Sequence, residues 1–304
     1  MMYNLKKPLL SICIPTDGNI KWVINTLHSI YNQKCDLNSF EVIVTDNGNS
    51  NELKEMIKKQ NYPTNFHYYK TNDQGFLNLI SALKLGTGLY CKMLNHRSIL
   101  LPGVIQQWSE IISRYQDEKP TIYFTDNVLG KFQYKECPNF ETFIQEMSYW
   151  TSWSAGIGIW DIDKPMLDSI EYNNMFPNTS ILFETRQNGK YIIWNEKYQE
   201  MQDDTGKGGY NIYKTFAVDF LDIINDLRLK DRISIRTFIH VKTKLYHFLK
   251  GWYCTLSVHK NKYTFDTSDM EMYLNVYYSK RETRNIKGDF QSRIKSIIKS
   301  LYYN

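Results

Sequence analysis

The first 125 residues alternate short apolar runs with amphipathic stretches, and this alternation restricts the fold more than any other feature of the chain. Each run has the length of a strand and ends at a turn signal, and apolar residues recur at helical spacing between the runs. Four strand–turn–helix units in succession predict an α/β fold with a doubly wound, mostly parallel sheet covered by helices. The expected strands are Leu9–Ile14, Phe40–Thr45, Phe66–Lys70, Leu89–Leu94 and Thr121–Thr125.

Polar residues follow each of the first four expected strands. These segments are Pro15-Thr16-Asp17, Asp46-Asn47, Asn72 to Gly75, and Asn95-His96-Arg97. The carboxyl ends of parallel strands meet at one edge of the sheet, where α/β proteins bind ligands in the crevice at which the strand order reverses. We therefore expect the four segments to form one polar site. Taken alone, Asp46 also fits a turn or helix cap, and that alternative stays open.

The rest of the chain is less regular. Lys131–Lys135 is typical of a hairpin edge, Thr179–Gln187 of a helix and Tyr191–Trp194 of a strand. From Tyr210 onward the pattern is helical, with basic residues throughout. We expect a first domain over 1–210, divided near residue 125, and a helical C-terminal extension over 211–304.

The composition excludes several classes of protein. Hydrophobic residues make up 42% of the chain, and no apolar run approaches the ~18 residues of a membrane span. The run that follows Lys6 and Lys7 ends at Pro15, which favours a first strand over a signal peptide. Five cysteines, with no Cys-x-x-Cys spacing, favour a reducing compartment over disulfides or zinc. We expect a cytoplasmic protein.

Positive charge is concentrated in the last part of the chain. Residues 225–304 hold 16 Lys and Arg against 7 Asp and Glu, whereas residues 1–224 hold 21 against 25. A basic region of this kind favours an anionic membrane surface or a phosphorylated lipid as partner, and near Ile294–Leu301 apolar and basic residues alternate at helical spacing. A solvated helical surface, a packed subdomain or a dimer contact are the alternatives. Nucleic acid is not expected, because no binding motif accompanies the charge.

Four motifs in order resemble a known family: IPTDGN, EVIVTDNGNSNE, TNDQGFLNLISAL and GTGLYCKML. Together they resemble the family-two glycosyltransferases of the A-type (nucleotide-diphospho-sugar transferase) fold, and within them the abequosyltransferase-like branch of bacterial O-antigen and capsule clusters. The resemblance is clear over about 9–130 and faint after residue 225. It implies a nucleotide-sugar-binding half over 1–125 and an acceptor half over 126–210.

The resemblance also implies roles for single residues. Pro15 and Thr16 would line the base pocket, Asp46 would bind the base or the ribose, and a carboxylate acceptor suits both. Asn72, Gly75 and Asn78 would shape the nucleoside and sugar side of the site. The full set of expected nucleotide-sugar-binding residues is Pro15, Thr16, Asp17, Asp46, Asn47, Asn72, Gly75, Asn78, Asn95, His96, Arg97 and Lys207.

The fourth strand departs from the family pattern. Family members end this strand in Asp-x-Asp, whose carboxylates hold a divalent metal against the donor diphosphate. Here Asn95-His96-Arg97-Ser98 follows the strand, so Mg²⁺ or Mn²⁺ is disfavoured and no cofactor is expected. Three interpretations stay open. Arg97 and a protonated His96 replace the metal, with Lys207 on a mobile loop as a lid; the site is degenerate; or Arg97 pairs with Asp17 or Asp126.

The catalytic base is not identified by the resemblance. The family places an acid before the helix that starts near Thr179, and Phe176-Pro177-Asn178 stands there instead. Asp126, Asp161 or Asp163, and Glu184 are the candidate bases, and each also fits an ordinary surface or capping role. The cluster of Trp150, Trp153 and Trp160 fits core packing, with stacking against an acceptor sugar as the alternative.

The sequence thus predicts a glycosyltransferase that moves a sugar from a nucleotide-sugar donor, expected to be a UDP-sugar, to a bacterial surface polysaccharide or lipid-linked glycan. It would work without metal, in the cytoplasm or at the inner face of the membrane. The alternative is a catalytically degenerate protein of the same fold that binds a partner enzyme or a glycan.

Overall fold

The computed structural model describes residues 7–130, 132–186, 189–259 and 261–287. The chain divides into two compact units, 1–203 and 204–304, which are described separately below. The division near residue 210 that the sequence suggests lies inside strand β11 (Gly208–Asn211). The expected amphipathic segment Ile294–Leu301 lies outside the described residues.

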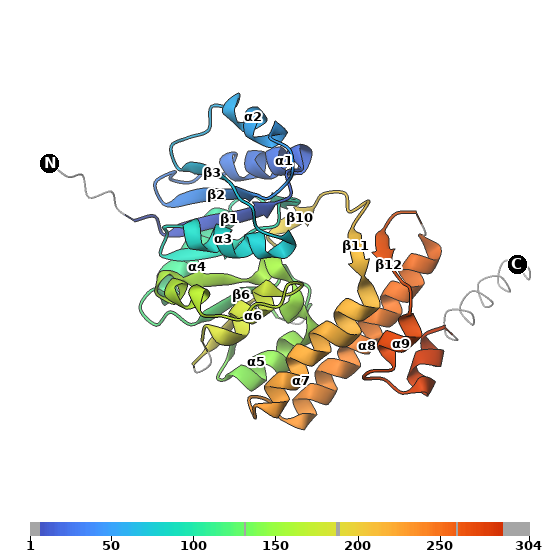
Figure 1. The fold of residues 1–304 in the computed structure, drawn as a ribbon. Helices are drawn as coiled ribbons and strands as arrows, with labels where there is room; N and C mark the ends of the chain where they lie inside the picture. The colour runs from blue at the N-terminus through green and yellow to red at the C-terminus, as the bar shows by residue number, and fades with distance from the viewer. Residues whose placement is uncertain (1–6, 131, 187–188, 260, 288–304) are drawn as a thin grey trace, which may run out of the picture. The chain divides into compact units, whose positions relative to one another are not determined.

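A five-stranded sheet forms the centre of the first unit (Figure 1). Its order is β3-β2-β1-β4-β8, in which the first four strands are parallel and β8 is antiparallel. The runs that form β1 and β2 are apolar and β-branched because almost every residue in them is buried, on both faces of the sheet. The strands are β1 (Leu10–Thr16), β2 (Phe40–Asp46), β3 (Phe66–Lys70), β4 (Tyr90–Met93) and β8 (Gly158–Trp160).

Helices connect these strands, as the 3.6-residue spacing predicts. The side chain of Asn19 caps the first helix by accepting from the main-chain N–H of Trp22, and Val23, Leu27 and Ile30 form its buried face. The third helix packs on β1, β2 and β4. The helices of the unit are α1 (Ile20–Tyr31), α2 (Glu52–Lys58), α3 (Asn78–Leu85), α4 (Val104–Tyr115), α5 (Phe140–Met147) and α6 (Pro177–Glu184).

The strand expected at Thr121–Thr125 forms, as β6 (Thr121–Phe124), but its placement in the parallel sheet is wrong. β6 belongs to a separate sheet of order β6-β9-β7, with β9 (Tyr191–Trp194) parallel to it and β7 (Tyr134–Cys137) antiparallel to β9. β8 takes the place beside β4. A Cβ at Gly158 would lie 2.4 Å from the Tyr90 ring, so glycine is what admits this ring beside β8. The Tyr90 hydroxyl then donates to the Ile122 carbonyl at 2.9 Å and links the two sheets.

A third pairing joins β5 (Ser98–Leu100) and β10 (Gln199–Met201) in antiparallel register. β5 comes directly after the polar segment that follows β4. Trp160 is fully buried, as core packing requires, whereas Trp150 and Trp153 are half-buried. All five cysteines are unpaired, and Cys13 and Cys91 are buried in β1 and β4.

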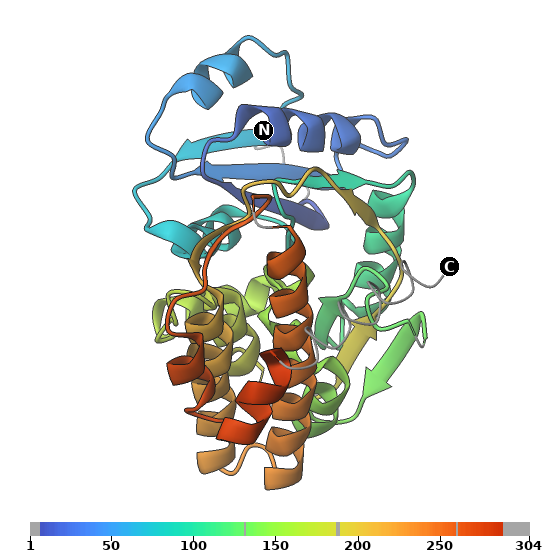
Figure 2. The same cartoon turned by 90° about the vertical axis from the view of Figure 1, so that its right-hand side faces the viewer.

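The second unit consists of a short parallel pair of strands and a group of helices (Figure 2). A π-helix at Lys214–Phe220 leads into α7, which forms a hairpin with the long helix α8. Among the described residues, no helix combines the length and the apolarity needed to cross a bilayer. The remaining elements are β11 (Gly208–Asn211), α7 (Leu221–Leu229), α8 (Ile235–Val258), β12 (Thr264–Asp266) and α9 (Met270–Leu274).

A lysine is enclosed in the core of the first unit. Lys92, in β4, has no exposed surface, and its ammonium donates to the carbonyls of Met93 (2.7 Å) and Ala155. It also lies 5.1, 4.9 and 5.2 Å from the ring centroids of Trp108, Phe124 and Tyr198. Burial lowers the pKa of Lys92 to about 7, although the charge of Asp126 acts in the opposite direction.

This pKa predicts how stability depends on pH. Above about pH 7 the folded protein has lost the Lys92 proton, whereas the unfolded chain keeps it up to about pH 10. The free energy of unfolding should therefore gain about 1 kcal/mol per pH unit from this residue between those values. Urea unfolding at the two ends of this window should show a smaller slope with pH for Lys92→Met than for the wild type, and an unchanged slope for the exposed control Lys34→Met. Equal slopes for all three proteins would contradict the prediction.

Candidate functional site

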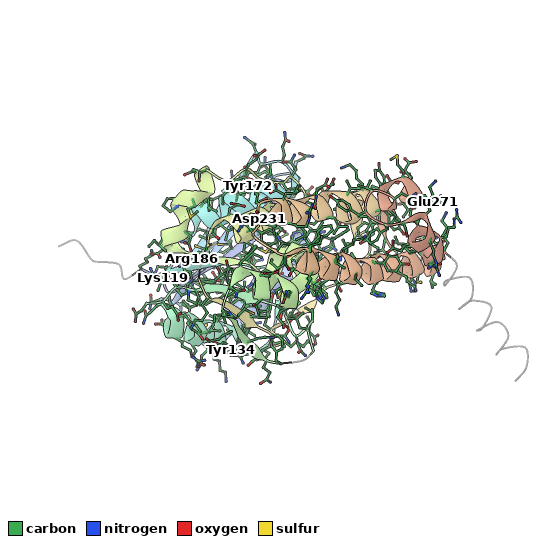
Figure 3. The ribbon with its side chains drawn as sticks, turned by 90° about the horizontal axis from the view of Figure 1, so that it is seen from below. Lys119, Tyr134, Tyr172, Arg186, Asp231 and Glu271 are labelled. Atoms are coloured by element: carbon green, nitrogen blue, oxygen red, sulfur yellow. The ribbon has the colours of Figure 1, made fainter. Side chains whose placement is uncertain are left out.

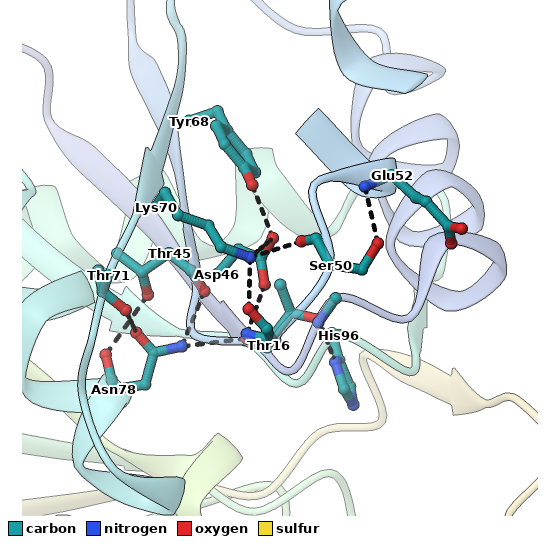
Figure 4. Close-up of polar contacts among 12 residues, drawn as sticks. Thr16, Thr45, Asp46, Ser50, Glu52, Tyr68, Lys70, Thr71, Asn78 and His96 are labelled. Atoms are coloured by element: carbon teal, nitrogen blue, oxygen red, sulfur yellow. Dashed lines mark hydrogen bonds and ion pairs between the residues drawn. The ribbon is translucent and has the colours of Figure 1, made fainter. Parts of the chain in front are cut away.

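The carboxyl ends of β1, β2 and β3 and the segment after β4 lie together, and Thr16 joins two of them (Figure 4). The Thr16 hydroxyl lies 2.7 Å from Nδ1 of His96 and accepts a hydrogen bond from the Gly18 N–H at 3.1 Å. The main-chain carbonyl of Thr16 accepts from the N–H of Asn47 at 3.1 Å. Pro15 precedes Thr16 in β1 and pairs with Thr45 of β2. The structure thus brings together the strand-end residues that the sequence selected.

Asp46, at the end of β2, is fully buried and accepts three hydrogen bonds. Oδ1 accepts from the N–H of Gly48 at 2.8 Å, and Oδ2 accepts from the Tyr68 hydroxyl at 2.6 Å and the Lys70 ammonium at 3.1 Å. The same ammonium donates to the carbonyls of Gly48 and Ser50. The carboxylate therefore orders the turn after β2, and a ligand would reach Oδ2 only by exchanging places with Tyr68 or Lys70.

Sequence reasoning missed Tyr68 and Lys70. The signal was present, because Lys70 ends the third expected strand and its parallel register places it beside Asp46. Tyr68 lies two residues earlier and therefore on the same face of β3. The Asp46 hydrogen bond raises the pKa of the Tyr68 hydroxyl, in addition to the larger effect of burial, so this hydroxyl stays protonated as a donor.

Asn78 uses its side chain entirely within the protein. Its amide nitrogen donates to the carbonyls of Thr16 (3.1 Å) and Thr45 (2.8 Å), and its Oδ1 accepts from the Thr71 hydroxyl at 3.0 Å. The residue is 2% exposed. It therefore ties β1 to β2 at their ends rather than presenting an amide to a ligand.

Asn47 positions the loop that follows β3. Its amide donates to the carbonyls of Asp73 (2.9 Å) and Gly75 (3.0 Å), and Gly75 adopts a φ of +50°, where a residue without Cβ is favoured. Asn72 is exposed in this loop. Oδ2 of Asp73 is buried and has no hydrogen-bond partner among the described residues, which leaves an acceptor open to a ligand donor.

His96 and Arg97 both pack against Trp22 of α1. The guanidinium carbon lies 3.8 Å from the Trp22 ring centroid, and the His96 and Trp22 ring centroids lie 5.3 Å apart. The Asn95 side chain accepts from the N–H of Arg97 at 2.9 Å and shapes the turn. Sequence reasoning missed Trp22, which sits beside the apolar positions of α1 and carried no separate signal.

His96 is neutral in this environment. Its pKa is lowered to about 4, mainly by burial; the charge of Asp17, whose Oδ1 lies 3.7 Å from Nδ1, acts in the opposite direction, and the charge of Arg97 adds to the lowering. Protonation of His96 beside a bound phosphate stays a prediction, since this pKa describes the ligand-free protein.

The residues after β4 do not suit a hard cation. Asn95 provides a single side-chain oxygen, already engaged with the Arg97 N–H, and a permanently charged guanidinium follows it. The described residues contain no group of three or more His, Cys, Asp or Glu side chains placed to hold a metal ion.

The candidate bases are separated in space. Oδ1 of Asp126 accepts from the N–H of Tyr198 and Gln199 and orders the start of β10, and burial raises the pKa of Asp126. Asp161 lies at the opposite edge of the sheet, where its N–H bonds the Leu89 carbonyl before β4 and its carboxylate pairs with Lys7 and Lys119. Although burial acts in the opposite direction, these ammonium groups hold the pKa of Asp161 below its ordinary value.

The other two acids lie near α6. Asp163 is buried, and both of its carboxylate oxygens accept from Nε–H of Arg186, at 3.0 and 2.9 Å. Glu184 is half-buried in the last turn of α6. Asn178, which replaces the acid of the family pattern, is buried with its amide 3.3 Å from the Thr151 carbonyl. None of these positions identifies a base.

Lys207 belongs to the second unit, where its ammonium lies 5.4 Å from the Trp252 ring centroid. Its role as a lid over the strand-end site stays a prediction.

Comparisons with known proteins agree with this architecture. Residues 11–91 match the model of the family described as Glycosyl transferase family 2, which confirms the resemblance over that segment. The abequosyltransferase RfbV of Salmonella typhimurium is 26% identical over 122 residues, which cover 39% of this chain and 35% of that protein. The matched segment is thus about a third of the relative's length.

Solved structures confirm the fold class. S. aureus TarS 1–349 in complex with UDP-GlcNAc superimposes with a TM-score of 0.57 at 14% identity, covering 92% of this chain and 80% of that one. The crystal structure of S. aureus TarS 1–349 superimposes with a TM-score of 0.52 at 12% identity, covering 92% of this chain and 79% of that one. At these identities the likeness shows the shared α/β fold with its parallel central sheet.

The His96 environment predicts a titration below the ordinary range. Between about pH 6.5 and pH 4 the unfolded chain binds a proton that the folded chain does not, so His96 lowers stability as the pH falls through this window, by roughly 3 kcal/mol at most. NMR titration should place the His96 midpoint near pH 4 in the wild type and lower in Asp17→Asn, because Asp17 favours the imidazolium. A His96 midpoint near 6.5 would contradict this description of the site.

Proposed function

We propose that this protein transfers a sugar from a nucleotide-sugar donor, a UDP-sugar, to a bacterial surface glycan of the O-antigen or capsule type. The observation that carries the proposal is the polar edge shared by β1, β2, β3 and the segment after β4, within the segment that matches the family model. Ligands of doubly wound sheets bind at this edge. The choice of a UDP-sugar is supported by the fold that this chain shares with TarS, whose structure is known in complex with UDP-GlcNAc.

The uracil-like base would bind near the loop after β3. Oδ2 of Asp73 is a buried acceptor without a partner, and a base N–H group is the donor that satisfies it. Asp46 supports this loop region indirectly, by fixing the turn opposite it. Asn47 links the turn after β2 to the loop after β3, because its side-chain amide donates to the Asp73 carbonyl.

Neutralisation of the leaving diphosphate would fall to Arg97. The guanidinium packs against Trp22, so the N–H groups of Arg97 are oriented before the nucleotide-sugar binds. Because Arg keeps its charge at all relevant pH values, it needs no proton or ion to act on a diphosphate. Neutral His96, fixed by Thr16, would donate or accept a hydrogen bond rather than supply charge. Reaction without a bound metal follows from this assignment.

This assignment predicts metal-independent turnover. Release of UDP from UDP-glucose, UDP-galactose and UDP-N-acetylglucosamine should be unaffected by EDTA. Arg97→Ala should lower turnover by about 10²-fold, the effect of removing one donor to a developing charge. Arg97→Lys should fall in between, since it keeps the charge but loses the planar stack on Trp22. Arg114→Ala, which removes an exposed arginine of α4, is the matched control and should behave as the wild type.

Two outcomes would overturn the proposal. Turnover that disappears in EDTA and returns with Mn²⁺ would show that metal ligands lie elsewhere in the chain. Absence of affinity for UDP and for all three donors would favour the alternative, a protein of this fold that binds a partner or a glycan without catalysis.

We further propose that the second unit attaches to an anionic membrane face, which would bring a lipid-linked acceptor near and place the protein at the cytoplasmic side. At the α7–α8 turn, Leu229 is 64% exposed and Ile235 and Ile239 are each 53% exposed. Lys230 and Arg236 are exposed beside them. Lys230 pairs with Asp226 at 2.7 Å, and exposed apolar side chains with cations beside them suit insertion among anionic headgroups.

Vesicle sedimentation tests this attachment. Ile235→Glu and Ile239→Glu should each lower the bound fraction several-fold on vesicles that contain phosphatidylglycerol, and added salt should weaken binding by the wild type. Val276→Glu, at a 56% exposed position outside this turn, is the control. Equal losses for all three variants, or equal binding to vesicles of phosphatidylcholine alone, would contradict the surface assigned here.

A further inference from the structure

The second unit contains a cavity of about 710 Å³ that the strand-end site does not involve. Ligand pockets in proteins measure roughly 300–1,000 Å³, so its size suits a small organic ligand or two to three sugar units. The cavity is lined from the end of α8, from β12 and from α9, all within the second unit.

Aromatic rings form one part of the lining. Tyr253, Tyr263 and Phe265 all line the cavity and are partly exposed. Trp252 packs edge-on against two of them, with ring centroids 5.3 Å from Tyr263 and 5.0 Å from Phe265. This packing holds the two rings in fixed orientations. Fixed, partly exposed rings offer flat apolar surfaces to a ligand.

Polar groups in the lining have hydrogen-bonding capacity that the described residues leave unused. Tyr213 is 1% exposed, and among the described residues its hydroxyl has no hydrogen-bond partner. Burial raises the pKa of Tyr213, so the hydroxyl remains a donor. The hydroxyl can therefore donate to a ligand oxygen in the cavity without giving up a hydrogen bond to the described residues.

Asp269 adds an acceptor. It lines the cavity at a φ of +53°, a left-handed conformation uncommon for residues other than glycine, and its carboxylate is exposed. Among the described residues, this carboxylate makes no hydrogen bond or ion pair. Thr267, two residues earlier, contributes a hydroxyl to the same lining.

The charges of the lining restrict the ligand class. Glu271 and Lys287 both line the cavity and form an ion pair, with Nζ of Lys287 2.5 Å from Oε1 of Glu271. Asp269 is then the one uncompensated charge among the lining residues, which disfavours phosphate and other anions. A single carboxylate, free hydroxyls and flat aromatic faces complement a ligand that has many hydroxyl donors and an apolar C–H face.

From these features we propose that the cavity is a binding site for a neutral glycan chain. The rings stack on the C–H faces of the sugar units, Asp269 accepts hydrogen bonds from their hydroxyls, and Tyr213 donates to a ring or hydroxyl oxygen. The proposed function supplies only the role of this site, which would be to hold the growing product of a transferase. Glycan binding itself is measured without a sugar donor, so its test does not depend on transfer activity.

Isothermal titration calorimetry of the full chain with neutral oligosaccharides derived from mannan, galactan, rhamnan and starch tests the site. At least one of them should bind the wild type. Tyr213→Phe should weaken that binding roughly fivefold to tenfold without lowering the melting temperature, because the hydroxyl it removes has no partner in the free protein. Asp269→Asn should weaken it about tenfold.

Asp231→Asn is the matched control. Asp231 is also an exposed aspartate with positive φ (+54°) in the second unit, but it lies at the α7–α8 turn, at the other end of α8 from Glu271 (Figure 3). It should bind as the wild type does. Arg97→Ala should keep glycan binding while losing UDP release, which separates this inference from the proposed function.

Three outcomes would overturn the proposal: no binding of any of the four glycan types, wild-type affinity in both Tyr213→Phe and Asp269→Asn, or binding of a quaternary ammonium probe such as phosphocholine in place of glycans. The last would assign the rings and Asp269 to a cation.

Discussion

The position of β1 between β2 and β4 is the constraint on which the site depends. Parallel pairing on both sides aligns the carboxyl ends of these strands, and β2 carries β3 in the same direction. A parallel sheet is buried on both faces, so its strands must be apolar and its polar residues accumulate where the strands end. Those polar residues need hydrogen-bond partners, and at this edge they form hydrogen bonds with one another. Thr16, Asp46 and Asn78 are all buried at this edge with their hydrogen bonds made inside the protein.

Because these buried groups already make their hydrogen bonds inside the protein, the polar edge offers fewer groups for direct contact with a ligand. A hydrogen bond to a charged group is worth about 1.5–3 kcal/mol, so a ligand that displaced Lys70 from Asp46 would first lose that contribution. The buried residues are therefore better suited to fixing loops than to direct contact. Oδ2 of Asp73 is also buried but has no partner among the described residues, so a ligand donor that reached it would displace no hydrogen bond.

The segment after β4 shows a different balance of charge from the family pattern. Where two carboxylates would attract a metal, a guanidinium is stacked on Trp22 and an imidazole is held neutral by burial and by its arginine neighbour. At the proposed diphosphate position, positive charge would thus come from the protein itself. Such a charge does not depend on metal concentration, and its position is set by packing against α1. The second unit has an aromatic cavity and an exposed apolar turn, which are the two surfaces proposed above to bind a glycan and a membrane.

The sequence by itself determined the parallel sheet, because short β-branched runs separated by helical periodicity have few other ways to be buried. It also determined which segments meet at the carboxyl edge, since parallel strands align their ends. Tertiary structure alone decided the rest. β8 and not β6 pairs with β4, and Gly158 makes room there for the Tyr90 ring. The register of β3 paired Lys70 with Asp46, Arg97 packs on Trp22, and burial lowers the pKa of His96. These outcomes depend on distances between residues far apart in the chain, which local periodicity does not encode.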